Sequence, residues 1–351
     1  LGHYLKNREW LDRYSPYELP AFDAYVYLAM AEHPAFFTVP PWGFRVLGPW
    51  LAHLLPAASA VQAFGVLSFG CLGLAGVLLF FYLRRLGHGV WACWLAGAAF
   101  GLSGPVGEVA SHVFLVEPVS LVLELAFLLA VEAGAGVGVM ALLAVLGALS
   151  KEVLIALIPV VYFARRDRDG DRRALMQTVL VAIPALLTAG LLRARWAPHL
   201  ATEPWSLGFE RLQTIATLIG SSWGGWLGLA LLGGVTPVAL LGALRRGCRP
   251  FLRRYGYVLF VTVLLGFFTP YAYALRYLQA ELRRLLIYAL PVLLPLCLWA
   301  LDRVLPHREA PPDPRPLLPA WRVLAGVSAA GLVALPLLVV DPYRRSDLRG
   351  L

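Results

Sequence analysis

About ten long apolar stretches, separated by short loops that carry arginine or acidic residues, fill the chain from residue 57 to its end. A helix needs about 20 predominantly apolar residues to cross the core of a bilayer. The pattern therefore predicts an all-α, polytopic transmembrane protein with about ten visible spans. Ionisable side chains at bilayer depth are costly and indicate functional sites. The predicted spans are 57–83, 90–109, 114–132, 135–150, 152–164, 174–193, 223–244, 256–273, 285–303 and 322–340.

The composition agrees with a membrane protein. Of the 351 residues, 59% are hydrophobic and only 15% are charged, whereas about a quarter of the residues in a soluble domain are charged. The net charge of +9 lies mostly in loops between spans, so it does not indicate nucleic-acid binding. The four cysteines have neither disulfide nor metal-site spacing. Lysine occurs only at Lys6 and Lys151, and this preference for arginine suggests a bacterial genome and hence a bacterial plasma membrane.

The arginine-rich segments predict the orientation, because cytoplasmic loops collect Lys and Arg. With the spans above, four such segments fall on one side: 84–85, 165–173, 245–254 and the Pro-rich linker 304–321. Residues 1–56 then form an extracytoplasmic first loop with amphipathic, interfacial helices, followed by a transmembrane domain over 57–351. Since the chain begins at a leucine, we expect a further upstream span, which makes eleven in the full protein.

The fourth and fifth spans meet at Ser150, Lys151 and Glu152. Together they have about 30 residues, which are too many for one span and few for two. We expect two short helices joined by a polar turn near one membrane face. The alternative is one long, kinked helix that buries Lys151.

Two residues of the first loop are of interest. Asp23 follows Phe22 at an expected helix start, where an acid is favoured by the helix dipole, so it is either a cap or a functional carboxylate. Arg45 lies in a turn between Trp42 and Trp50, which suit headgroup depth. Arg45 either contacts lipid phosphate nonspecifically or belongs to a specific anion site.

A second group of ionisable residues lies between the second and third spans. Glu108 and His112 are spaced i, i+4 on one helical face, and a carboxylate with an imidazole could hold a divalent cation such as Mg or Mn. Glu117 begins the next span. Glu124, two turns further on, is expected to face the protein interior, where its simplest role is a structural hydrogen bond.

The third group is basic and lies on the side that is otherwise poor in positive charge. Arg283 and Arg284 stand at the entrance to the ninth span, and Lys151 stands at the turn between the fourth and fifth. Arginine binds phosphate through bidentate, charge-assisted hydrogen bonds. The three residues are therefore predicted to bind one fixed anion, and the alternative is snorkelling to outer-leaflet headgroups.

The order of several motifs resembles the glycosyltransferase-C superfamily of integral membrane enzymes. These motifs are FDAYVYLA around Asp23, PPWGFRVLGPWLA around Arg45, VEP at Glu117, LSKEVLIALIP at Lys151 and ELRRLLIYALP at Arg283 and Arg284. The resemblance implies a polyprenyl-phosphate sugar donor and an active site on the extracytoplasmic face. It implies that Asp23 is the catalytic base or helps to hold a metal, that Glu117 is a second acid, and that Lys151, Arg283 and Arg284, with Arg45, bind the donor phosphate. The paired acidic motif of some members is missing, because Asp23 has Phe22 and Ala24 as neighbours.

The sequence thus predicts an inverting hexosyl or pentosyl transfer from a polyprenyl phosphate to an extracytoplasmic glycan, lipid or protein. A carboxylate can take the proton of a hydroxyl acceptor, and cations can stabilise charge on the leaving phosphate. A transporter or flippase for an anionic lipid or glycan is the alternative from another class. It should show inverted repeats and helices broken near the midplane, and the sequence shows no repeat. A noncatalytic assembly subunit would leave Asp23, Lys151 and Arg283 without a shared role.

Overall fold

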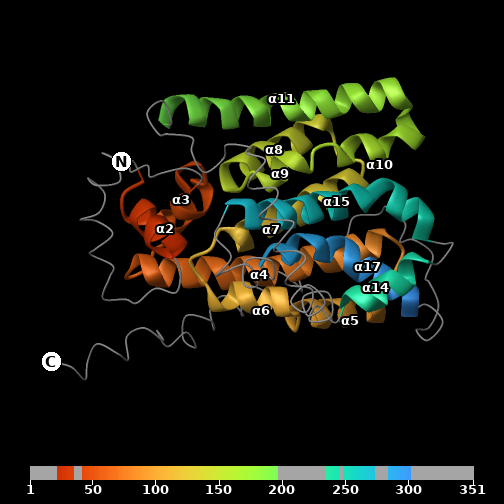
Figure 1. Cartoon of the computed structure of the whole chain (residues 1–351), viewed down its shortest axis with the longest axis horizontal. Helices are drawn as coiled ribbons and strands as arrows, with labels where there is room; N and C mark the ends of the chain where they lie inside the picture. Colours follow the sequence, from red (N-terminus) through yellow and green to blue (C-terminus); the bar gives the residue numbers. More distant parts are fainter. Residues whose placement is uncertain (1–21, 35–41, 197–234, 245–247, 273–283, 302–351) are drawn as a thin grey trace.

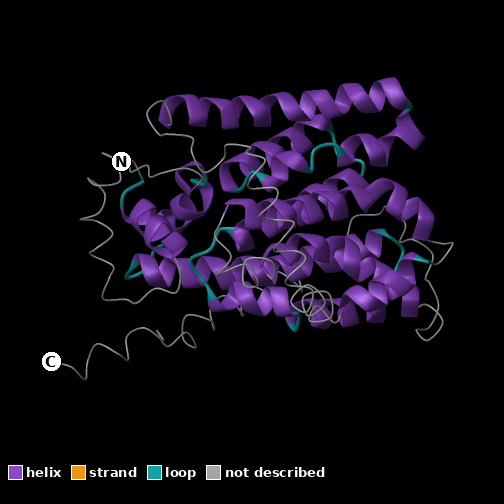
Figure 2. Ribbon diagram, in the orientation of Figure 1, coloured by secondary structure: helices purple, strands orange, loops and turns teal. Residues whose placement is uncertain are grey.

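The computed structural model describes residues 22–34, 42–196, 235–244, 248–272 and 284–301, and throughout this part the chain is helical, with no strand (Figure 2). The predicted all-α fold is confirmed for these residues. Arg283, the predicted span 322–340 and the first half of the span 223–244 lie outside them. The elements, shown in Figure 1, are α2 (Phe22–Glu32), η2 (Trp42–Phe44), α3 (Leu47–Leu54), α4 (Ala60–Arg85), α5 (Val90–Gly101), α6 (Gly104–Ser111), α7 (Glu117–Glu132), α8 (Val137–Ser150), α9 (Val153–Ala156), α10 (Val160–Asp169), α11 (Asp171–Trp196), α14 (Val235–Ala243), α15 (Arg249–Ala272), η6 (Leu286–Ala289) and α17 (Leu290–Leu301).

Two of the described helices are long and apolar enough to cross a membrane, namely α4 and the Asp171–Ala194 part of α11. The pair α5 and α6, bent by 48°, makes a third if the two count as one broken span. Several predicted spans are interrupted by helix ends that hydropathy does not detect. Ser103 caps α6 by accepting a hydrogen bond from the Val106 amide, and this cap divides the predicted span 90–109. The count of ten spans therefore stays a prediction.

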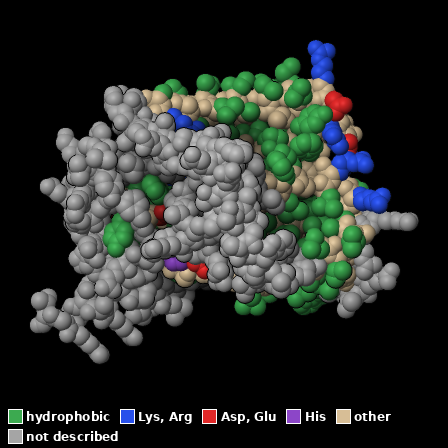
Figure 3. Space-filling model, viewed as in Figure 1, with side chains coloured by type: hydrophobic (Ala, Val, Ile, Leu, Met, Phe, Trp, Pro, Cys, Tyr) green, Lys and Arg blue, Asp and Glu red, His purple; other side chains and the backbone are tan. Residues whose placement is uncertain are grey.

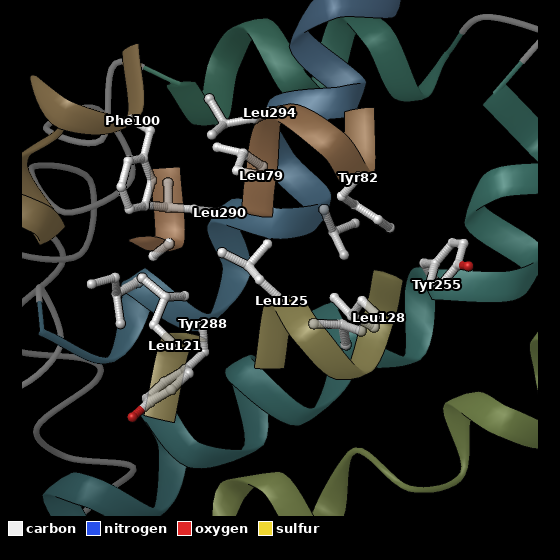
Figure 4. Close-up of a cluster of buried hydrophobic side chains, with 14 of the residues drawn as sticks. Leu79, Tyr82, Phe100, Leu121, Leu125, Leu128, Tyr255, Tyr288, Leu290 and Leu294 are labelled. Atoms are coloured by element: carbon white, nitrogen blue, oxygen red, sulfur yellow. The ribbon is translucent and has the colours of Figure 1, made fainter. Parts of the chain in front are cut away.

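The helices pack lengthwise around α7. Helix α4 lies along one side of α7 and α8 along another, while α11 forms one edge of the bundle (Figure 1). Leucines of α7 fill the interface, together with aromatic residues from α4, α15 and η6 (Figure 4). The residues of this core that Figure 4 labels are Leu79, Tyr82, Phe100, Leu121, Leu125, Leu128, Tyr255, Tyr288, Leu290 and Leu294.

The bundle has one strongly basic end. At the end of α7, Glu132 accepts a hydrogen bond from the Tyr255 hydroxyl and pairs with Arg254, with 3.9 Å between Oε1 and Nη1. The Tyr255 ring packs on Tyr82, near the end of α4, with 5.9 Å between centroids. The ends of α4 and α10 and the starts of α11 and α15 thus gather their arginines at one end, and Figure 3 shows basic side chains there. Glu117, at the other end of the 16-residue α7, lies about 22 Å away along the helix axis.

The chain breaks at Lys151, as the sequence predicted, but this break lies inside the protein. Helix α8 ends at Ser150, and Lys151 is extended, with φ −163° and ψ 142°. Gly147 lets α9 fold back against the last turn of α8, because a Cβ at Gly147 would lie 2.7 Å from Cβ of Leu154. Lys151 is only 6% exposed. Two helices therefore meet at Lys151, as predicted. Lys151 is nevertheless buried, which had been expected only for the alternative of a single kinked helix.

Candidate functional site

The Asp23 carboxylate is held by two donors from distant segments. Asp23 lies in the first turn of α2. The Trp42 indole N–H donates to its Oδ1 at 2.7 Å, and Arg284 Nη1 donates to its Oδ2 at 3.2 Å. Both contacts are tertiary, so the role of Asp23 extends beyond the local cap that its position in α2 suggested.

Arg284 also reaches Glu117, which begins α7. Arg284 Nε lies 3.0 Å from Glu117 Oε1, and Lys151 Nζ lies 2.5 Å from the same oxygen. Lys151 Nζ stands over the Tyr288 ring as well, 5.2 Å from its centroid. A single carboxylate oxygen therefore joins the break after α8 to the segment before η6.

Arg45 connects the first loop to the same region. Its Nε donates to Glu152 Oε2 at 3.1 Å, and its Nη1 donates to the Tyr27 hydroxyl at 3.3 Å. Burial by itself lowers the pKa of Arg45, but the adjacent Glu152 carboxylate and Tyr27 raise it more, so the net pKa lies well above its ordinary value. Burial raises the pKa of the Tyr27 hydroxyl. Arg45 is therefore charged and Tyr27 neutral at physiological pH.

These contacts define an acid–base cluster of six charged side chains. Three are acidic and three are basic, so their formal charges sum to zero. They come from five parts of the chain, all at the end of α7 away from the basic end. A buried charge is costly unless it is paired, and each member has an opposite charge within 3.2 Å. The members of the acid–base cluster are Asp23, Arg45, Glu117, Lys151, Glu152 and Arg284.

The structure thus brings together five of the residues singled out in the sequence: Asp23, Arg45, Glu117, Lys151 and Arg284. Glu108 lies on α6 and His112 directly follows its last residue, with 3.5 Å between Glu108 Oε1 and His112 Nδ1. Within the described ranges, no group of three or more His, Cys, Asp or Glu side chains could hold a metal ion. A Mg or Mn ion at Glu108 and His112 stays a prediction.

Sequence reasoning missed several neighbours of the acid–base cluster. Trp42 was expected at headgroup depth, but its indole N–H is directed to Asp23. Tyr27 occurs in an apolar helix without any distinguishing spacing. The Ser120 and Ser150 hydroxyls are hydrogen-bonded at 2.7 Å and tie α7 to the end of α8, directly before Lys151. Glu152 was not missed, because the sequence placed it beside Lys151 in the predicted polar turn, and it pairs with Arg45 in the cluster.

Glu124 lies deeper along α7, with none of its surface exposed. It faces the interior, as expected. Neither of its carboxyl oxygens has a hydrogen-bond partner among the described residues, so the structural hydrogen bond expected from the sequence is not seen there.

Comparisons of the chain with protein-family models, with curated proteins and with solved structures gave no match. The function is therefore inferred from the residues of the acid–base cluster and from their arrangement.

Proposed function

We propose that the protein is a membrane glycosyltransferase that moves a sugar from a polyprenyl-phosphate donor to an extracytoplasmic acceptor. The observation that carries the proposal is the meeting of Asp23 with Lys151 and Arg284 in one buried cluster. These residues come from three distant parts of the chain and combine a carboxylate with two cations. Such a set suits a reaction that needs a base and a stabilised anionic leaving group.

In this reaction Asp23 takes the proton of the acceptor hydroxyl as the new bond to the sugar anomeric carbon forms. The bond from that carbon to the phosphate oxygen breaks on the opposite side, which inverts the configuration. Lys151 and Arg284 then bind the polyprenyl phosphate that leaves, and Arg283 is proposed to act with them. Arg45, held by Glu152 and Tyr27, supports the phosphate from the first loop, and Glu117 positions Lys151 and Arg284.

A location in the bacterial plasma membrane fits both the donor and the charge distribution. The donor carries a long lipid, so an enzyme within the bilayer can meet it directly. The acid–base cluster lies at the end of α7 away from the arginine-rich end. Because arginines collect on the cytoplasmic side, we place the reaction on the extracytoplasmic side.

The decisive experiment measures release of polyprenyl phosphate from a polyprenyl-phosphate sugar by the purified full chain. Asp23→Asn retains the shape of the side chain but removes the charge, so transfer should fall by roughly 10²-fold or more. Asp171→Asn, at the basic end of the bundle, is the matched control and should retain full activity. Equal activity of Asp23→Asn and the wild type would exclude Asp23 as the base.

One observation favours a transporter or flippase as the second candidate function. Transporters often place ligand sites at broken helices, and here the chain breaks at Lys151, inside the acid–base cluster. The cluster lies at one end of α7 and not at its middle, which favours the enzyme. Movement of the labelled donor between leaflets of a vesicle, without cleavage from its sugar, would decide for the transporter.

A further inference from the structure

We propose that the acid–base cluster binds its anionic ligand together with one proton, and that Glu117 takes up this proton. The inference rests on the proposed function for the nature of the ligand, a polyprenyl phosphodiester. The inference states in addition that Glu117 is protonated when the ligand is bound, so that binding should depend on pH.

The two cations that would bind the ligand are already engaged by carboxylates. Lys151 Nζ and Arg284 Nε both contact Oε1 of Glu117, at 2.5 and 3.0 Å. Arg284 Nη1 also contacts Asp23 at 3.2 Å. A phosphate oxygen placed between Lys151 and Arg284 would displace Glu117 Oε1, which contacts both cations.

The displaced carboxylate would lie in a buried part of the protein. Glu117 is 1% exposed and Arg284 is 8% exposed. With Lys151 and Arg284 turned to the phosphate, the displaced Glu117 carboxylate would keep an uncompensated negative charge in a buried position. Such a charge is strongly disfavoured unless the group neutralises itself by binding a proton. One proton on Glu117 removes this buried charge.

Glu117 is the acid best placed to accept that proton. Its Oε2 is buried and has no hydrogen-bond partner among the described residues, so a proton there would displace no existing contact. Both oxygens of Asp23 already accept hydrogen bonds. Glu152 is less suited, because its side chain is 32% exposed and water stabilises its charge.

The surroundings of Glu117 support the same assignment. Lys151 and Arg284 are the cations that stabilise its charged form in the free protein, and both would turn to the ligand on binding. Once these two cations also contact a phosphate, the ionised form of Glu117 loses stabilisation, whereas its protonated form does not. The other titratable groups that interact electrostatically with Glu117 are Arg45 before α3, Tyr27 of α2 and Tyr288 of η6, with Asp23 beyond Arg284 and Glu124 further along α7.

The proposed step is balanced. The ligand replaces Glu117 Oε1 at Lys151 and Arg284, a proton from water binds Glu117, and no covalent bond of the ligand changes. Because coupling between two ligands is reciprocal, anion binding favours protonation and protonation favours anion binding. The affinity should therefore fall as the pH rises, by about tenfold per pH unit wherever one full proton is taken up.

The test is calorimetric titration of the purified full chain with geranylgeranyl methyl phosphate, a phosphodiester with a single charge. The titration is repeated at one pH in two buffers with different ionisation enthalpies, and the difference in heat gives the number of protons taken up. We expect about one proton per bound ligand for the wild type. Glu117→Gln, which cannot take up the proton or compete as an anion, should bind the ligand more tightly and without proton uptake. Asp171→Asn is the control and should behave as the wild type does.

The outcomes separate this inference from the proposed function. Binding by the wild type without proton uptake would overturn the inference and leave the glycosyltransferase proposal standing, as would equal uptake by Glu117→Gln. The wild-type measurement alone decides the point if Glu117→Gln does not fold. Absence of binding would overturn both proposals. Proton-coupled binding without sugar release would support the inference and contradict the enzyme.

Discussion

Asp23 and Arg284 are 261 residues apart in the sequence and are joined by an ion pair, with 3.2 Å between Oδ2 and Nη1. The pair links α2, the first described helix, to the segment that enters η6. Since Arg284 also contacts Glu117, its single guanidinium forms ion pairs with two carboxylates. In this state the proposed base is held by one of the proposed phosphate ligands, so binding of the donor should release it.

Substitutions of Lys151 and Glu117 should have strongly coupled effects on the free energy of unfolding. Breaking a buried ion pair by removing one partner costs about 3–5 kcal/mol, so Lys151→Met and Glu117→Gln should each destabilise the protein by that order. The double variant should lose less than the sum, with a coupling of about 1–3 kcal/mol. Denaturant unfolding in detergent measures the three free energies. The pair of Arg168 and Asp169, in which the Arg168 side chain is 55% exposed, is the control, and its coupling should stay below about 1 kcal/mol. Additive losses at Lys151 and Glu117 would contradict a shared contact.

Gly147 should be intolerant of even one added methyl group. A Cβ there would lie 2.7 Å from Cβ of Leu154, whereas a Cβ at Gly138 on the same helix would meet nothing within 4 Å. Gly147→Ala should therefore destabilise the protein by about 1–3 kcal/mol and move α9, weakening phosphodiester binding next to Lys151. Gly138→Ala should be neutral or add up to about 1 kcal/mol of helix stability. Thermal unfolding and ligand titration of the two variants check both expectations, and equal effects would show that α9 does not depend on this close approach.

Glu124 should be dispensable for stability. Its carboxyl is fully buried and has no hydrogen-bond partner among the described residues, so Glu124→Leu removes a desolvation cost and keeps a similar volume. We expect an increase in unfolding free energy of about 1–3 kcal/mol. Glu132→Leu is the comparison, because Glu132 accepts a hydrogen bond from Tyr255 and pairs with Arg254. This variant should be less stable than the wild type. A clear loss in Glu124→Leu would mean that the carboxyl has a bonded or charged partner.

The sequence predicted the type of fold and several members of the site because these follow from simple physical costs. Long apolar stretches must form helices when they lie in a bilayer. The charges that interrupt them, such as Lys151 and Arg284, are few and expensive enough to be recognised as functional candidates. That reasoning needs no knowledge of which residues touch.

The interruptions and the pairings could not be predicted in the same way. The cap at Ser103 divides a stretch that hydropathy treats as continuous. The break at Lys151 was predicted, but the close contact of Gly147 with Leu154, which sets how α9 folds back on α8, was not. Trp42 was placed at the headgroups on its residue type alone, and its bond to Asp23 is set by how η2 packs near α2. Pairings of this kind depend on tertiary packing, which a single sequence does not specify locally.

The orientation of the protein can be tested at two exposed positions at opposite ends of the bundle. Ser111 ends α6, shortly before Glu117, and Asp167 lies near the end of α10 in the basic segment. In a variant without the four native cysteines, Ser111→Cys should react with a membrane-impermeant maleimide on intact cells. Asp167→Cys should react only after permeabilisation, because the arginines around it are expected in the cytoplasm. Acidic residues contribute little to topology, so replacing Asp167 should not alter the orientation. Labelling of Asp167→Cys from outside would place the acid–base cluster in the cytoplasm and exclude an extracytoplasmic transfer reaction.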